Sequence, residues 1–233
     1  MYFLTKKILN LKKKNPILLL SGGIDSYLAW CLLQKPESLF IKLQNRNNDD
    51  QIQCLVKLIK DHNINNIKMT NEIFSYIEDH DVFFYIYLIY HALKLFPDRF
   101  IIFPKTFSLT FDSKLFLYLL KGIDPKGYIL TPFLSNTREE LYSLAQKDGI
   151  TIENIFQGTH SCSLNKKEYC GKCFHCIERY IFFNNNGVVF RYENKKIDLS
   201  SWLALIDHNN IKFSIKNISN TIKTYIKSVN TFK

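Results

Sequence analysis

Residues 17–26 read Ile-Leu-Leu-Leu-Ser-Gly-Gly-Ile-Asp-Ser, and this stretch decides the fold. The apolar run 17–20 is typical of a buried strand, and the residues from Asp25 onward follow a helical pattern. Between them, Gly22 and Gly23 permit positive φ and close backbone approach, so that successive N–H groups can surround an anion at a helix N-terminus. The stretch therefore predicts a phosphate-binding turn that joins a strand to a helix.

The polar side chains of this turn limit which ligands it could bind. Ser21 and Ser26 add hydroxyl donors, while Asp25 would repel a bare phosphate and fits only if Mg²⁺ or a hydroxyl lies between them. The predicted ligands are ATP and Mg²⁺. The spacing matches neither Walker A nor the dinucleotide fingerprint, because no Gly-Lys-Ser/Thr and no third glycine follow. The structural alternative is a glycine turn between a core strand and a core helix that binds nothing.

Strand and helix patterns alternate along the first 150 residues. We expect strands at 17–20, 39–43, 67–69, 100–103 and 128–131, and helices at 25–35, 52–59, 81–96 and 111–120. A further helix is expected to be capped by Asn136 or Thr137 and to end near Gly149. Such alternation predicts an α/β fold in which a parallel twisted sheet carries helices on both faces. The aromatic residues of 83–90 fall within one apolar helix, so we interpret them as core residues rather than as a base-stacking surface.

Composition narrows the class of protein. The chain has 233 residues, 46% of them hydrophobic, which is ample for a core, and a net charge of +10 that suits polyanions without deciding whether nucleic acid is bound directly. The basic residues before Pro16 lead straight into the glycine turn rather than into a signal-peptide pattern. The longest apolar run, 82–90, is far shorter than the roughly 20 residues of a membrane helix. We expect a soluble cytoplasmic protein that does not enter a membrane.

A second constellation lies near residue 170. Cys162, Cys170, Cys173 and Cys176 have the spacing C-x7-C-x2-C-x2-C, which suits tetrahedral Zn²⁺ bound by four thiolates. An Fe–S cluster is the rival metal site, and disulfides are the structural alternative. A closed shell of four cysteines implies a structural metal rather than a catalytic one. Cys31 and Cys54 lie in apolar helical contexts and are expected to be core residues.

Together, the two constellations resemble a known family. The Ser-Gly-Gly-x-Asp-Ser turn resembles the PP-loop of ATP pyrophosphatases, whose fold is that of the adenine nucleotide alpha-hydrolases. Combined with the cysteine spacing and Arg179 three residues after the last cysteine, it resembles the 7-cyano-7-deazaguanine synthases, the QueC family. The detailed match covers 17–33 and 158–180, with residues 131–133 similar to the family's Thr-Pro-Leu segment.

The resemblance implies an ATP-dependent synthase that releases AMP and pyrophosphate. It would adenylate the carboxylate of a 7-deazaguanine, and attack by ammonia would give the amide and then the nitrile of queuosine biosynthesis. The residues implied to bind ATP are Ser21, Gly22, Gly23, Asp25 and Ser26. Asp25, Ser26 and Arg179 are the implied catalytic residues, with Arg179 oriented toward substrate or phosphate; by spacing alone, Arg179 is equally a surface or salt-bridge residue. The resemblance also implies a homodimer.

The chain departs from the family pattern in the segments that are expected to shape the acceptor pocket, 43–46, 78–81 and 105–110. It also continues about 50 residues beyond the cysteines. We therefore expect three parts: an ATP-binding domain at 1–157, a zinc-binding segment at 158–183, and an extension at 184–233 with helical packing elements that docks on the core or joins two subunits.

These departures leave other functions open. A QueC-like enzyme could couple a deazaguanine-type group to an amine of a protein partner in an antiviral defence system, because the first half-reaction is the same. A PP-loop enzyme that modifies tRNA would need a reactive cysteine, and all four clustered cysteines are better used on zinc. A nucleotide-binding subunit whose catalysis has decayed would bind ATP without releasing pyrophosphate.

Overall fold

The computed structural model describes residues 2–43, 67–72, 81–108, 111–160 and 173–188. The chain divides into two compact units, Met1–His160 and Ser161–Lys233. The predicted helix at 52–59 lies outside the described residues, as does the extension from residue 189 onward.

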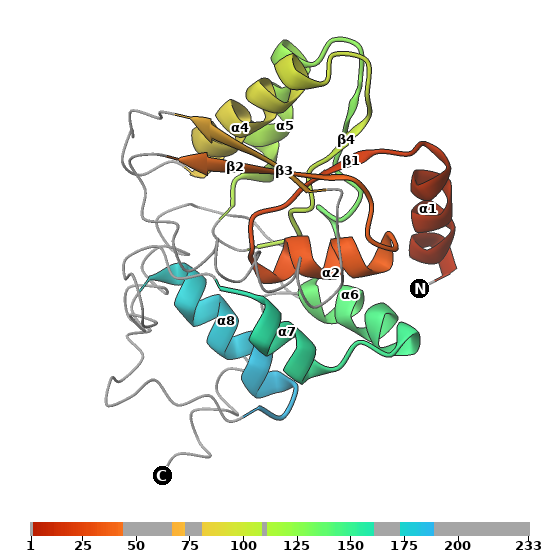
Figure 1. The fold of residues 1–233 in the computed structure, drawn as a ribbon. Helices are drawn as coiled ribbons and strands as arrows, with labels where there is room; N and C mark the ends of the chain where they lie inside the picture. The colour runs from red at the N-terminus through yellow and green to blue at the C-terminus, as the bar shows by residue number, and fades with distance from the viewer. Residues whose placement is uncertain (1, 44–66, 73–80, 109–110, 161–172, 189–233) are drawn as a thin grey trace. The chain divides into compact units, whose positions relative to one another are not determined.

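The first unit is built on a five-stranded sheet (Figure 1). Its strands are β1 (Ile17–Leu19), β2 (Ser38–Leu43), β3 (Ile67–Glu72), β4 (Ile101–Ile102) and β5 (Ile129–Leu130). Their order is β3-β2-β1-β4-β5, and every neighbouring pair is parallel. The predicted parallel sheet is confirmed, with β1 in the middle. Ile17 and Leu18 of β1 are completely buried, as expected for a strand that is covered on both faces.

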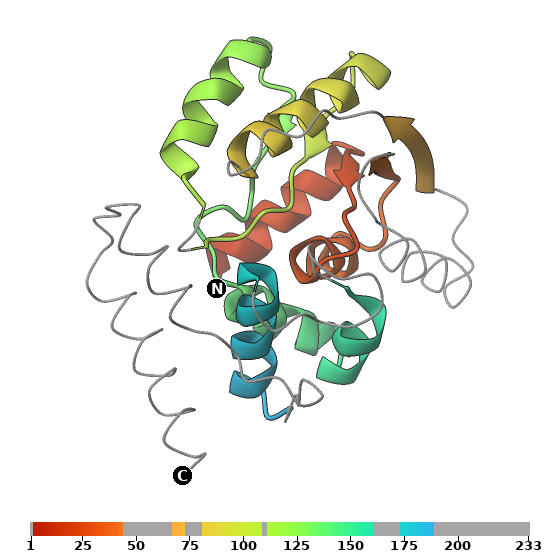
Figure 2. The ribbon, with the colours of Figure 1, turned by 90° about the vertical axis from the view of Figure 1, so that its left-hand side faces the viewer.

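Helices cover both faces of this sheet, which confirms the second part of the prediction. The helices of this unit are α1 (Tyr2–Lys13), α2 (Ile24–Leu32), α4 (Asp81–Leu95), α5 (Ser113–Ile123), α6 (Arg138–Ala145) and α7 (Ile152–Gly158). As Figures 1 and 2 show, α4 and α5 lie together on one face, and α2 and α6 lie on the other. Because β1 is the middle strand, the turn between β1 and α2 lies at the middle of the carboxyl edge of the sheet.

The core between the sheet and α4 and α5 is rich in aromatic rings. The ring of Tyr85 lies 5.1 Å from that of Phe103 and 5.7 Å from that of Phe111, measured between centroids. Core packing of the aromatic helix is thus confirmed for Tyr85, whereas Phe83 and Tyr90 of the same helix are more than two-fifths exposed.

Local signals set the ends of α6. The Thr137 hydroxyl accepts a hydrogen bond from the backbone N–H of Glu140, and the Glu140 carboxylate accepts one from the backbone N–H of Thr137. This capping box starts the helix at the predicted place. A 3₁₀ turn (Gln146–Asp148) follows α6, and Gly149 ends it with φ of +80°.

Helix α1 is an element that the sequence analysis missed. Leu4, Ile8 and Leu11 are buried and recur at helical spacing in a segment that also carries four lysines. The Lys7 ammonium donates a hydrogen bond to the carbonyl of Pro132, which follows β5. The segment is therefore an amphipathic helix packed on this unit.

The described part of the second unit is α8 (Phe174–Asn185) with the residues that flank it. This helix begins inside the predicted cysteine segment, so that Cys173 stands at its N-cap position and Cys176 in its first turn. Neither cysteine is exposed: Cys176 is completely buried and Cys173 nearly so.

Candidate functional site

The candidate site lies where three neighbouring strands end. The turn at 20–23 follows β1, residues 103–106 follow β4, and the loop after β5 leads to Arg138 at the start of α6. Because the strands are parallel, their carboxyl ends share one edge of the sheet, which is where open α/β sheets bind ligands.

Two serine hydroxyls hold the turn closed. The Ser26 hydroxyl accepts hydrogen bonds from the N–H and the hydroxyl of Ser21, at 3.2 and 3.1 Å, and donates to the Gly23 carbonyl at 2.9 Å. Ser26 is only 1% exposed, whereas Ser21 is exposed. In this conformation Ser26 therefore shapes the turn with its proton committed to the backbone, and Ser21 is the hydroxyl that faces solvent.

The two glycines of the turn have different conformations. Gly22 uses the freedom of glycine, with φ of +75°, whereas Gly23 has φ of −86° and ψ of 169°, which other residues also adopt. A Cβ built on Gly23 would lie 3.5 Å from the Ser21 hydroxyl oxygen, an ordinary contact. Nothing within the described protein therefore demands glycine at position 23.

The N-terminus of α2 lacks the cap that its neighbours have. Asp112, Thr137 and Thr151 cap α5, α6 and α7 with side-chain oxygens, whereas Gly23 at the N-cap of α2 makes no side-chain hydrogen bond. The first N–H groups of a helix have no intrahelical acceptor and carry the positive end of the helix dipole. An anion is the natural partner for them.

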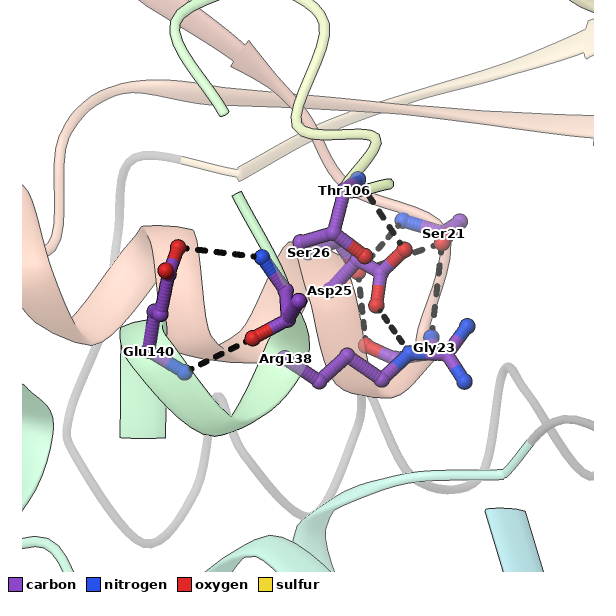
Figure 3. A network of polar contacts seen from close by, with 8 residues as sticks. Ser21, Gly23, Asp25, Ser26, Thr106, Arg138 and Glu140 are labelled. Atoms are coloured by element: carbon purple, nitrogen blue, oxygen red, sulfur yellow. Dashed lines mark hydrogen bonds and ion pairs between the residues drawn. The ribbon is translucent and has the colours of Figure 1, made fainter. Parts of the chain in front are cut away.

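Asp25, in the first turn of α2, is bound by two segments that lie far from it in sequence (Figure 3). The Arg138 Nε donates to its Oδ1 at 2.5 Å, and the backbone N–H of Thr106 donates to its Oδ2 at 3.3 Å. Burial alone would raise the pKa of this carboxyl, but the charges of Arg138 and Lys105 and the two hydrogen bonds lower it to about 2. Asp25 is therefore a carboxylate at neutral pH.

Two buried polar residues follow β4. Lys105 is 7% exposed, and its ammonium lies 5.9 and 5.5 Å from the ring centroids of Tyr85 and Phe111. Thr106 is completely buried, and its hydroxyl has no hydrogen-bond partner among the described residues. The sequence analysis singled out this segment as a departure from the family pattern but gave neither residue a role.

Arg138 was missed altogether, although the sequence carries a signal for it. A cation in the first turn of a helix is disfavoured by the helix dipole, so its presence directly after the Thr137 cap asks for another reason. The structure supplies that reason, because the side chains of Arg138 and Asp25 are 15% and 13% exposed and form an ion pair. A lysine after a buried strand, such as Lys105, is a comparable signal.

The end of α7 supports the turn from outside. The backbone N–H of His160 donates to the Gly22 carbonyl at 2.9 Å, and Gly158 lies against the ring of Tyr27. A Cβ on Gly158 would stand 2.8 Å from the Cε2 atom of Tyr27. Residues 158–160 thus pack with the first unit and hold the turn.

The structure describes only part of the predicted cysteine site. Cys173 and Cys176 are described, and Cys162 and Cys170 lie outside the described residues, as does Cys54. Within the described ranges, no group of three or more His, Cys, Asp or Glu side chains could hold a metal ion. Cys31, expected in the core, is half-buried, and burial raises the pKa of its thiol to about 12.

Arg179 lies on α8 in the second unit. It is 1% exposed, and its guanidinium carbon stands 4.6 Å from the ring centroid of Phe183. The alternative of a surface arginine is therefore wrong. Arg179 and the turn at 20–23 belong to different compact units.

Other features bear on the class of protein. None of the helices in the described ranges is both long and apolar enough to cross a membrane. Of the segments expected to shape an acceptor pocket, 44–46, 78–80 and 109–110 lie outside the described residues.

Comparisons with known proteins give a broad likeness to solved structures. No protein-family model matches the chain, and no curated protein matches it. Among solved structures, the chain is similar to the structure of NMN synthetase from Francisella tularensis, with a TM-score of 0.47 and 17% sequence identity over 100% of this chain and 95% of that chain.

Proposed function

We propose that this chain is an ATP-dependent synthase of the PP-loop type that adenylates the carboxylate of a small molecule, with release of pyrophosphate. The observation that carries the proposal is the turn after β1. It combines the Ser-Gly-Gly-x-Asp-Ser sequence, an uncapped N-terminus of α2, and a buried Asp25 ringed by donors. A turn that only joined two core elements would not need these features.

The groups of the turn suit the triphosphate. The first N–H groups of α2 are donors for phosphate oxygens. The exposed Ser21 hydroxyl donates to Ser26 in this conformation and would turn to a phosphate oxygen when the nucleotide binds. Arg138 donates from Nε to the Asp25 carboxylate, which places a guanidinium beside the turn. A guanidinium presents donors in a planar fork that matches phosphate oxygens.

Asp25 is the residue that would hold Mg²⁺. Its carboxylate is ionised, and each oxygen accepts one hydrogen bond within the protein, which leaves lone pairs for a metal ligand. When bound, Mg²⁺ would neutralise charge on the phosphates and on the departing pyrophosphate. The fixed charge of Arg138 acts in the same sense.

The chemistry requires no protein nucleophile. The acceptor carboxylate attacks the α-phosphorus of ATP, and the bond from that phosphorus to the pyrophosphate oxygen breaks, giving an acyl adenylate. Ammonia then displaces AMP to form an amide, and a second adenylation on the amide oxygen allows dehydration to a nitrile. We propose a 7-deazaguanine carboxylate as the acceptor, on the combined resemblance of the turn and of the cysteine segment.

We further propose that Cys162, Cys170, Cys173 and Cys176 bind one structural Zn²⁺. The two described members support this, since Cys173 and Cys176 occupy the N-cap position and first turn of α8 and are both buried. A Cys-x-x-Cys step at a helix N-terminus can present two sulfurs to one ion, and the helix dipole favours their thiolate form.

The test combines product analysis with a matched pair of variants. Full-length protein with Mg·ATP, 7-carboxy-7-deazaguanine and ammonium should yield AMP, pyrophosphate and a product with the mass of the amide or nitrile. Asp25→Asn keeps the shape of the side chain but removes the carboxylate that would hold Mg²⁺. It should therefore lower turnover by on the order of 100-fold or more. Asp98→Asn, at an exposed position, should leave turnover unchanged.

The outcomes separate the parts of the proposal. AMP formation without amide or nitrile keeps the ATP chemistry and removes the deazaguanine acceptor. Wild-type turnover in Asp25→Asn removes Asp25 from the mechanism. A chain that binds no Mg·ATP and forms no AMP with any carboxylate overturns the proposal.

A further inference from the structure

Among the described residues, the buried and half-buried groups around Asp25 carry more positive than negative charge. Arg138 and Lys105 provide two cations against one carboxylate. The two Asp25 oxygens already accept from Arg138 and from the backbone of Thr106, and Lys105 makes no hydrogen bond or ion pair within the described ranges. A buried cation without a hydrogen-bonded partner is unfavourable. The component that would balance this cluster is an anion.

The Thr106 hydroxyl points to the same conclusion independently. It belongs to a completely buried side chain, and no atom of the described protein accepts or donates a hydrogen bond to it. Leaving a buried hydroxyl unpaired costs about 1–3 kcal/mol. Because its own backbone N–H is bound to Asp25, this hydroxyl is fixed beside the candidate site.

The position of Lys105 is set by the core rather than by solvent. Its ammonium lies near the rings of Tyr85 and Phe111, and both rings are held by other aromatic side chains: Tyr85 by Phe103, and Phe111 by Phe116. A lysine ordered in this way loses little side-chain freedom when it binds a ligand.

We propose that Lys105 and Thr106 form the subsite that binds the carboxylate of the acceptor. The proposal rests on the proposed function and names the part of the site that recognises the acid. One carboxylate oxygen accepts from the Lys105 ammonium and the Thr106 hydroxyl. The other attacks the α-phosphorus, and the electron pair of the broken bond leaves with pyrophosphate. Charge balances without proton transfer, because one negative charge enters on the carboxylate and one remains on the acyl adenylate.

The nucleotide phosphates have other partners, which is why the acid is assigned here. In the proposed function the phosphates bind at the N-terminus of α2. Arg138 donates to Oδ1 of Asp25, whereas the Thr106 backbone donates to Oδ2. Asp25 therefore lies between the groups proposed to bind phosphate and the proposed carboxylate subsite. An anion site made of a lysine and a threonine also explains why this chain carries Lys105-Thr106 in a segment that departs from the family pattern.

The first experiment measures protection of the Lys105 amine in full-length protein. The rate of acylation by an amine reagent is followed by peptide mass spectrometry, with Lys126 as the internal control because it is exposed and also lies beside a ring, 5.8 Å from the Tyr128 centroid. The probes are 7-carboxy-7-deazaguanine, its uncharged 7-amido counterpart, benzoate, inorganic pyrophosphate and Mg·ATP. We expect the carboxylates to slow labelling of Lys105 and not of Lys126, and the amide to have no effect.

The second experiment compares variants by equilibrium binding. Lys105→Met and Thr106→Val should weaken binding of the carboxylate by on the order of tenfold each, the value of a hydrogen bond to a charged group, with the dissociation constant for Mg·ATP unchanged. Thr106→Ser should restore binding because it restores the hydroxyl, and Lys126→Met should bind like the wild type. Circular dichroism of each variant checks that it is folded.

Each outcome either supports or overturns the proposed carboxylate subsite. Protection by pyrophosphate or Mg·ATP alone, or a loss of Mg·ATP binding in Lys105→Met, assigns Lys105 to the nucleotide and overturns the subsite. Absence of protection by every carboxylate overturns it as well. Carboxylate binding that depends on Lys105, in a protein that neither binds nor turns over ATP, supports the subsite while the proposed function fails.

Discussion

Asp25 accepts hydrogen bonds from residues 81 and 113 positions away in the sequence, and this arrangement gives the turn its charge. The sequence identified Asp25 through its motif, but its partners could not be predicted because they come from the ends of other strands. The burial that would raise the pKa of its carboxyl is outweighed only because Arg138 and Lys105 meet there. Such long-range contacts are a property of the tertiary structure.

Acid should destabilise the protein through Asp25. Its pKa of about 2 in the folded chain lies below the ordinary 3.8, so its contribution is fully present above about pH 4 and is lost as the pH falls toward 2. We expect the wild type to lose about 2 kcal/mol more free energy of unfolding than Asp25→Asn over this range. Urea unfolding of both proteins at a series of pH values measures the difference, and parallel curves would contradict it.

The two glycines of the turn should respond differently to alanine. Gly22→Ala places a Cβ at φ of +75° and should cost about 1–2 kcal/mol of stability. Gly23→Ala has no such strain and should fold normally, yet it puts a methyl group at the N-terminus of α2 and should weaken Mg·ATP binding by on the order of tenfold.

The control for both variants is Gly122→Ala in α5, where nothing lies within 4 Å of the added Cβ. This variant should not lower the stability of the protein, and it should leave nucleotide binding unchanged. Thermal unfolding and titration with Mg·ATP distinguish the cases. Undiminished affinity in Gly23→Ala would mean that phosphate does not approach the turn at this residue.

At the scale of elements, the signals that succeeded are those that act within a few residues. The Thr137 capping box and the left-handed Gly149 placed both ends of the α6 segment, and the apolar run before Ser21 placed β1. Helix α1 was missed because its buried Leu4 and Ile8 are outnumbered by lysines. Its stability comes from packing on the rest of the unit, which a local pattern does not contain.

The contact between α2 and α7 should be sensitive to a single methyl group. Gly158→Ala would bring a Cβ within 2.8 Å of the Tyr27 ring, and Tyr27 is 5% exposed, so the ring has little room to move. We expect a loss of about 1–3 kcal/mol. The coupling is measured by chemical unfolding of three variants: Gly158→Ala, Tyr27→Leu and the double variant. Gly158→Ala should lower the free energy of unfolding less when Tyr27→Leu is already present. Fully additive losses would show that the ring and the helix end do not interact.

For the whole molecule, the location of the candidate site followed from one consequence of parallel topology. Once alternating strands and helices are read as a parallel sheet, the turn after the first strand must lie at the carboxyl edge, where ligands bind. What could not be derived is which other residues reach that edge. Lys105 and Arg138 are ordinary basic residues in the sequence, and only the adjacency of β1, β4 and β5 turns them into partners of Asp25.

The second unit should be a metal-dependent part of the molecule. If the four cysteines bind one Zn²⁺, purified protein contains about one equivalent of zinc per chain, and Cys173→Ser loses most of it because three thiolates no longer close the shell. Cys31→Ser is the matched control, since Cys31 lies in α2 outside the cysteine segment, and it should keep its zinc. Elemental analysis measures the content, and visible absorption would reveal iron–sulfur instead. Zinc binding that is equal in both variants, or absent from the wild type, would refute the four-cysteine site.

A chelator should lower the thermal stability of the wild type and leave that of Cys173→Ser unchanged, because binding free energy at such a site is folding free energy.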